Sequence, residues 1–234
     1  FMKQYMTQTA LGVLFGISQP KANMLIHYFI PILSSALNEL GDIPCRDMKH
    51  IKFFKEEEGS AYCHDGTERH VSRPKNSIRQ KENYSGKKKT HTVKNCVVVN
   101  VECIVIFLTE TVGGRKHDKK LADEAEYILP KGSRLLQDAG FQGFSVDNVS
   151  TIQPVKKQKG KELTYEEKER NKKISRIRIR IEHVISSIKR YRIVKDTFRN
   201  WLRGFADTVM EIACALHNFR LKFRPWQKIK ADHL

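Results

Sequence analysis

The stretch from residue 164 to residue 195 most constrains the fold, because it contains neither glycine nor proline and carries a regular apolar stripe. Thr164 and Glu167 have the spacing of a capping box, which marks a helix start. The stripe recurs at steps of three and four residues and consists of Ile174, Ile177, Ile181, Val184, Ile185 and Ile188. Because such a stripe must pack against another element, the pattern predicts one long helix, ending near Lys195, that packs on a sheet.

The centre of the chain alternates short β-type runs with one helical stretch. A run rich in valine and isoleucine at 90–100 is followed closely by another at 103–110, which predicts a hairpin. The other expected elements are strands at 59–68 and 149–155, a helix at 118–129, a brief apolar run at 133–140 and a last amphipathic helix at 201–222. This order predicts a mixed α/β fold, with a sheet flanked by helices.

The first forty residues are helical in pattern. Thr7 and Ser18 can each cap a helix, Gly16 separates the two, and Pro20 lies in the first turn of the second. This spacing suits a helix-turn-helix that binds DNA in the major groove, and it suits an ordinary helical hairpin equally well. We therefore expect a helical region at 1–44, a main domain at 45–225 and a tail at 226–234.

Positive charge is confined to two stretches of the chain. The formal net charge is +17, whereas residues 69–95 alone carry +8 and residues 153–200 carry +10, so the rest is nearly neutral. Concentrated basic charge favours a polyanion, with nucleic acid as the leading class. There is no apolar run of roughly 18 residues and no signal peptide, so we expect a soluble, intracellular protein without a membrane partner. Five scattered cysteines, none in a C-x-x-C pair, predict reduced thiols rather than disulfides or zinc ligands.

Three acidic residues are candidates for metal chemistry. Arg178, Glu182 and Lys189 are spaced by four and seven residues, so they share one edge of the long helix beside its apolar stripe. Asp65 and Asp138 each follow an apolar run and precede a small residue, which predicts carboxylates at strand ends. Two carboxylates at strand ends and one on a helix can hold a pair of Mg²⁺ or Mn²⁺ ions for phosphoryl transfer.

The segments around these acids resemble the DDE transposases of bacterial insertion sequences, in particular the IS-five-like group related to Harbinger transposases. The resemblance covers nearly the whole chain and rests on five segments: HDGTE at 64–68, YSGKKKTHTVK at 84–94, GGRKHDKKLADE at 113–124, QDAGFQG at 137–143 and NKKISRIRIRIEHVISSIKRYRI at 171–193. Arg178, Glu182 and Lys189 match the spacing of the family's third-acid helix, while Ser175 stands where relatives have tyrosine.

This resemblance implies an RNase H-like fold and a transposase that cuts DNA at the element's ends and joins the freed 3′-hydroxyl to target DNA. Asp65, Asp138 and Glu182 are then the catalytic residues and the ligands of two Mg²⁺ or Mn²⁺ ions. The residues implied in DNA binding are Arg178, Lys189, Lys87, Lys88, Lys89 and Lys21, with Arg178 and Lys189 alternatively orienting Glu182. A homodimer on DNA, in the bacterial cytoplasm and associated with the nucleoid, is also expected.

Two other functions are compatible with these residues. A nuclease of the same fold would use the same metal chemistry without strand transfer, and a DNA-binding protein derived from a transposase would need only the basic surface and the amino-terminal helices. His117, Asp118 and His183 are expected in structural roles, with Asp118 at a helix start. No Ser-His-Asp, P-loop or Rossmann pattern is present, so neither ATP nor a nicotinamide cofactor is indicated.

Overall fold

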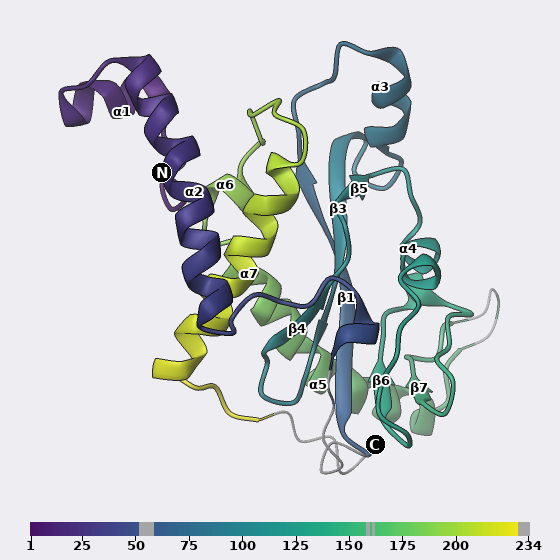
Figure 1. The fold of residues 1–234 in the computed structure, drawn as a ribbon. Coiled ribbons are helices and arrows are strands. Elements are labelled where there is room, and N and C mark those ends of the chain that lie inside the picture. The colour runs from purple at the N-terminus through teal and green to yellow at the C-terminus, as the bar shows by residue number, and fades with distance from the viewer. Residues whose placement is uncertain (52–58, 158–159, 161, 229–234) are drawn as a thin grey trace.

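The computed structural model describes residues 1–51, 59–157, 160 and 162–228, and a mixed sheet lies at its centre (Figure 1). Its strands are β1 (Ala61–His70), β2 (Tyr84–Ser85), β3 (Thr90–Val99), β4 (Val105–Leu108), β5 (Val112–Gly113), β6 (Arg134–Leu136) and β7 (Ser150–Ile152). They are ordered β2-β3-β1-β6-β7, and β4 and β5 also pair with β3. β3 runs antiparallel to β1 and β4, whereas β6 runs parallel to β1 and β7. The mixed α/β prediction and the 90–110 hairpin are thereby confirmed.

Helices cover both faces of this sheet (Figure 1). They are α1 (Gln8–Phe15), α2 (Gln19–Glu39), α3 (Ser77–Asn83), α4 (Asp118–Glu124), α5 (Tyr165–Ile188), α6 (Arg192–Lys195) and α7 (Phe205–Phe223), with short 3₁₀ turns at Met48–His50 and Ala139–Phe141. Cys63 of β1 belongs to the same buried cluster as Ile181 of α5 and Met210 of α7. Tyr62, the preceding residue, packs in a second cluster with Leu121 of α4. Because successive strand residues face opposite ways, α5 and α7 lie on one face and α4 on the other.

Helix α5 begins as predicted and ends earlier than predicted. The capping box is present, since Thr164 Oγ1 accepts from the Glu167 amide at 3.2 Å and Glu167 Oε2 accepts from the Thr164 amide at 2.8 Å. The helix stops at Ile188, so the expectation that it continues to Lys195 is wrong. A straight helix would turn Ile193 about 140° away from Ile188. The break at 189–191 instead lets Ile193 become buried in α6, where its amide donates to the carbonyl of Met2 at 3.2 Å.

Two other predicted boundaries also move. Helix α4 ends at Glu124 rather than near Leu129, because the chain turns at Glu126, whose φ is 44°, and buries Tyr127 and Leu129 under the sheet. Helix α7 starts at Phe205 rather than 201, after Gly204, which has a φ of 78°. Glycine adopts this left-handed conformation without steric cost, and it redirects the chain into the helix.

The amino-terminal helices form as the capping pattern predicts. Thr7 and Ser18 accept hydrogen bonds from the first turns of α1 and α2, and Gly16 ends α1 in a left-handed conformation. Helix α2 packs on α7 and shares its hydrophobic cluster, while α1 projects from the body (Figure 1). The DNA-binding role of these helices and the domain boundary at 44 stay predictions. Of the predicted tail, residues 229–234 lie outside the described residues.

A buried asparagine joins the connector after α2 to the sheet. The Asn218 side chain of α7 accepts from the Val105 amide and donates to the carbonyls of Val105 and Asp42, all at 2.9 Å. An unpaired buried polar group costs about 1–3 kcal/mol, so these bonds favour one docking position for α7 on β4. All five cysteines are free thiols, and in the described part of the chain no helix is long and apolar enough to cross a membrane.

Candidate active site

Asp65 lies in the middle of β1 rather than at a strand end. The strand continues to His70 because each residue from Cys63 to His70 pairs with a residue of β3, so the expected strand end at residue 68 is wrong. Asp65 follows Cys63 by two residues, and side chains two apart in a strand point to the same face. Asp65 therefore faces the α5 side of the sheet, as Cys63 does. Its Oδ1 accepts a hydrogen bond from the amide of Gly66 at 2.8 Å.

Strand register brings Asp138 next to Asp65. Asp138 follows β6 by two residues, which agrees with the predicted position at a strand end. Cys63 of β1 pairs in parallel with Leu136 of β6, so the positions two residues further along both strands are neighbours. Residues 65 and 138 are those positions.

A histidine and a glutamine lock this register on the opposite face. His64 Nε2 and Gln137 Oε1 lie 2.8 Å apart, and each residue immediately precedes one of the two aspartates. His64 is fully buried against aromatic rings, and this burial lowers its pKa to about 3. Because its imidazole is therefore neutral, the hydrogen bond fixes the spacing of the two strands without adding charge. Sequence reasoning missed this pair.

The α5 edge contributes a cation to this cluster. Arg178 Nη1 is 3.3 Å from Asp138 Oδ1, and the Arg178 side chain is only 11% exposed. At the C-cap, just after the end of α5, Lys189 Nζ donates to the backbone carbonyl of Glu68 at 3.3 Å. Burial, with the nearby charges of Lys88 and Arg69, lowers the pKa of Lys189. Neither Arg178 nor Lys189 contacts Glu182. The alternative prediction that they orient the Glu182 carboxylate is therefore not supported by any contact between described residues.

Glu182 lies on the same edge of α5, between these two contacts. It is exposed and forms no hydrogen bond or ion pair with any described residue. The structure thus brings Asp65, Asp138 and Arg178 together and places Glu182 one turn beyond Arg178 with its carboxylate unengaged. Ser175, at the family's tyrosine position, is also exposed on α5.

Asp118 is a fourth acid near this cluster, which the sequence assigned only to a helix start. It is indeed the first residue of α4, but a Cβ at Gly66 would lie 3.0 Å from Asp118 Oδ1, so its carboxylate packs directly on β1. Lys94 holds it there through a 2.9 Å ion pair and also lies 3.4 Å from Glu68. The glycine after Asp65 was the signal that a side chain approaches the strand closely.

Burial disfavours the charged form of Asp65. The pKa of Asp65 is raised from 3.8 to about 6, mainly by burial, and the charges of Asp138 and Asp118 push it in the same direction. The Gly66 amide and Arg178 oppose this rise without cancelling it. A buried carboxylate destabilised by neighbouring carboxylates is stabilised by a bound cation.

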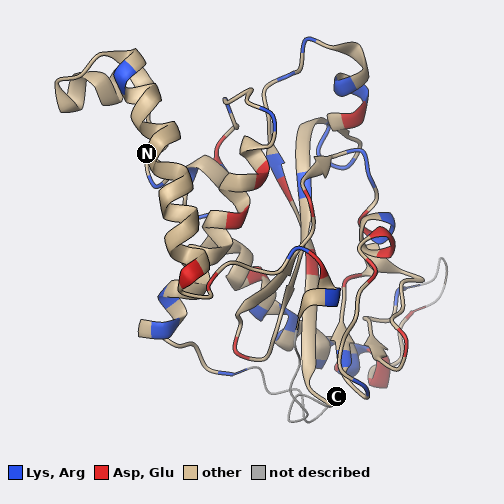
Figure 2. Ribbon diagram, viewed as in Figure 1, with Lys and Arg blue, Asp and Glu red and all other residues tan. Residues whose placement is uncertain are grey.

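The remaining predicted DNA contacts are exposed lysines. Lys87, Lys88 and Lys89 lie in the loop between β2 and β3, and Lys21 lies in the first turn of α2. Figure 2 shows in blue how lysine and arginine are distributed over the fold. Lys88 is close enough to Lys189 to depress its pKa, so this loop approaches the candidate site. For Lys87, Lys89 and Lys21 the structure gives exposure only, and their role stays a prediction.

Comparisons with known proteins show the family of this chain. A family profile described as "DDE superfamily endonuclease" matches residues 64–218, more than half of the chain. This chain belongs to that family of endonucleases. It is also 29% identical, over 224 residues, to a protein of Microchaete diplosiphon named "Probable transposase for insertion sequence element IS702", with 96% of this chain and 78% of that protein covered. No solved structure matches.

Membership of this family implies the use of a divalent metal ion, and the donor set fits one. Carboxylate oxygens are the ligands that Mg²⁺ and Mn²⁺ prefer, and the site presents two adjacent aspartates, Asp65 and Asp138. Among the described residues, no three acidic, histidine or cysteine side chains already converge as a metal site. Glu182, which has no competing partner, is the side chain on α5 that is available to complete one.

Proposed function

We propose that this protein is a DNA transposase that cuts the ends of a mobile element and joins them to target DNA. The observation that carries the proposal is the register of β1 and β6, which sets Asp65 beside Asp138 along the edge of α5 that bears Arg178 and Glu182. The insertion-sequence relative and the family match support the same function. An IS-five-like affiliation is part of the proposal, supported by the segments around the acids.

The proposed catalytic fold is RNase H-like. Its support is the strand order β4-β3-β1-β6-β7, with the first three strands antiparallel and the last two parallel to β1. If the two-residue strands β2 and β5 are not counted, Asp65 lies on the first strand, β1, and Asp138 follows the fourth strand, β6. A helix carrying the third acid then packs on the sheet, as α5 does here.

Asp65, Asp138 and Glu182 would hold two Mg²⁺ or Mn²⁺ ions. When bound, such ions activate the attacking oxygen and stabilise the leaving oxygen of an in-line phosphoryl transfer. Asp65 must lose its proton to act as a ligand, and burial raises the pKa of that carboxyl to about 6. Arg178 keeps the Asp138 carboxylate oriented toward the α5 edge, while Lys94 holds Asp118 against β1.

DNA phosphates are the proposed partners of the cations around this site. Lys88 and Lys189 lie close together beside β1, and Lys87 and Lys89 extend the same exposed loop. Phosphate contacts of this kind position DNA without reading its sequence. Lys21 and the amino-terminal helices are proposed as a further DNA contact, and a homodimer on DNA would process two ends together.

A strand-transfer assay tests this function. Purified protein with Mg²⁺ and a duplex carrying the element's end should release a 3′-hydroxyl, and pre-cleaved ends should become joined to a second, unrelated duplex. Joined products are expected because hydrolysis and joining use one site with a different attacking oxygen. Cleavage without any joining of pre-cleaved ends would instead identify a nuclease.

A further inference from the structure

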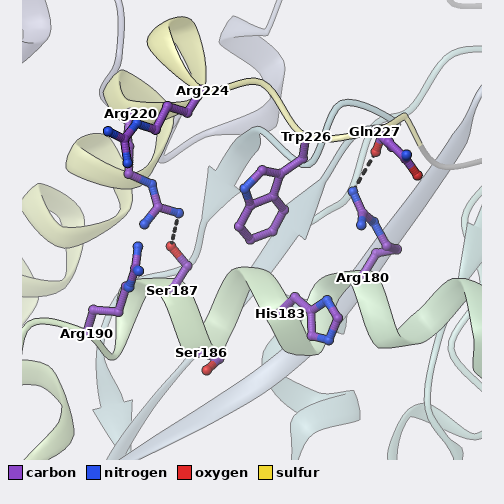
Figure 3. Close-up of a pocket in the computed structure, with 9 residues that line it drawn as sticks. All are labelled: Arg180, His183, Ser186, Ser187, Arg190, Arg220, Arg224, Trp226 and Gln227. Atoms are coloured by element: carbon purple, nitrogen blue, oxygen red, sulfur yellow. Dashed lines mark hydrogen bonds between the residues drawn. The ribbon is translucent and has the colours of Figure 1, made fainter.

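Four arginines line a hollow of about 540 Å³ between α5 and the chain that follows α7. Arg180 comes from α5, Arg190 lies two residues beyond its end, Arg220 comes from α7 and Arg224 from its carboxyl end, with Trp226 at the centre (Figure 3). At 100° per residue, this face of α5 is centred about a third of a turn from the edge that bears Glu182. The hollow is therefore separate from the candidate active site.

No described carboxylate pairs with these arginines. The described residues that line the hollow include neither aspartate nor glutamate. Arg220 Nη2 donates to the hydroxyl of Ser187 at 2.7 Å and Arg180 donates to the backbone carbonyl of Gln227, so both partners are neutral.

Two arginines of the hollow are entirely uncompensated. The side chains of Arg190 and Arg224 have no hydrogen bond or ion pair with a described residue, and both residues are exposed. By contrast, Arg46 and Arg192 each contact an aspartate, at 2.7 and 2.9 Å. The hollow thus concentrates uncompensated positive charge at one place on the surface.

A buried relay fixes the geometry of Arg220. His217 Nε2 lies 3.0 Å from the carbonyl oxygen of Cys103 and must donate to it, so Nδ1 accepts the hydroxyl proton of Ser187 at 2.8 Å. The Ser187 oxygen is then free to accept from Arg220. Burial lowers the pKa of His217, which keeps the imidazole neutral. Because a guanidinium has five donors, Arg220 retains several for a ligand.

We propose that this hollow binds backbone phosphates of DNA, as a second DNA contact about a third of a turn around α5 from its acid-bearing edge. The choice of DNA as the polyanion rests on the proposed function. Arg180 and Arg220 flank the Trp226 ring, with guanidinium carbons 5.5 and 5.7 Å from its centroid, so the indole is not free to stack on the base of a mononucleotide (Figure 3). Trp226 is also the only large apolar side chain among the described residues of the lining, which disfavours a lipid surface. Arginine forks match phosphate oxygens well.

The test measures binding of a short DNA duplex of arbitrary sequence against salt concentration, and it needs no cleavage. Each phosphate contact contributes about 0.9 to the slope of log affinity on log salt. The double variant Arg190→Gln with Arg224→Gln should lower this slope by about one to two. The matched control, Lys173→Gln with Arg176→Gln, removes the same charge from exposed, unpaired positions of α5 outside the hollow and should change the slope by clearly less.

Three outcomes would overturn the proposal. The first is an unchanged salt slope in the Arg190 and Arg224 variant. The second is an equal drop of the slope in the control variant, which would mean a diffuse basic surface. The third is that the Arg190 and Arg224 variant loses binding to phosphatidylserine vesicles while its DNA binding is unchanged. Both substitutions are at exposed side chains, and thermal unfolding checks that the variant is folded. Since the assay reads binding alone, failure of the strand-transfer assay would not affect its outcome.

Discussion

Replacing Asp65 with asparagine should abolish DNA cleavage and at the same time stabilise the metal-free protein. Asparagine keeps an acceptor for the Gly66 amide but cannot supply a charged ligand. We expect cleavage to fall about a thousand-fold or more, since metal ions contribute several kcal/mol to such transition states. The gain in unfolding free energy at neutral pH should be about 3 kcal/mol, because the Asp65 pKa rises from 3.8 to about 6 on folding.

The pH dependence of this gain follows from the direction of the shift. Because the folded protein holds the Asp65 proton more tightly than the unfolded chain, ionisation of Asp65 costs stability, fully so above pH 6. The difference between variant and wild type should therefore shrink as pH falls from 6 toward 4, as urea unfolding without metal would measure. A stability difference independent of pH would contradict the raised pKa of Asp65.

Replacing Glu182 with glutamine should remove cleavage without affecting stability. The carboxylate is exposed and has no described partner, so the unfolding free energy should change by no more than about 0.5 kcal/mol. Cleavage should fall by more than about 100-fold, which is the upper range for losing a group that merely supports a metal ligand. Single-turnover cleavage of a labelled end duplex measures this effect.

Glu166→Gln is the matched control for Glu182. Glu166 is another exposed carboxylate of α5, near its amino-terminal end and outside the proposed site. It should keep cleavage near the wild-type rate. Equal cleavage by the Glu182 and Glu166 variants would remove Glu182 from the proposed ligands, and strong destabilisation by Glu182→Gln would show a structural role instead.

Local sequence signals predicted much of this fold. The capping box of Thr164, the left-handed Gly16 and the isoleucine stripe of α5 each depend on neighbours within a few residues, and each forms as expected. The end of α5 was wrong because it depends on distant contacts. Ile193 is buried in a separate helix that is bonded to Met2, and no local breaker announces it.

The sequence nominates the residues of the proposed site but does not predict their geometry. The segments around Asp65, Asp138 and Glu182 carry a family likeness, but the adjacency of the two aspartates depends on pairing between β1 and a strand of only three residues. The ion pair between Arg178 and Asp138 depends on long-range packing as well. The same is true of the approach of Asp118 to Gly66. The arginine hollow could not be predicted, because it depends on where the chain runs after α7, and no sequence periodicity predicts that path.

The most direct test of the proposed metal site is a crystal structure of the protein soaked in Mn²⁺ and recorded at a wavelength where manganese scatters anomalously. Anomalous density should lie between Asp65 and Asp138, with the Glu182 carboxylate turned toward it from α5. Density at other residues, with these three carboxylates unliganded at saturating Mn²⁺, would contradict the account.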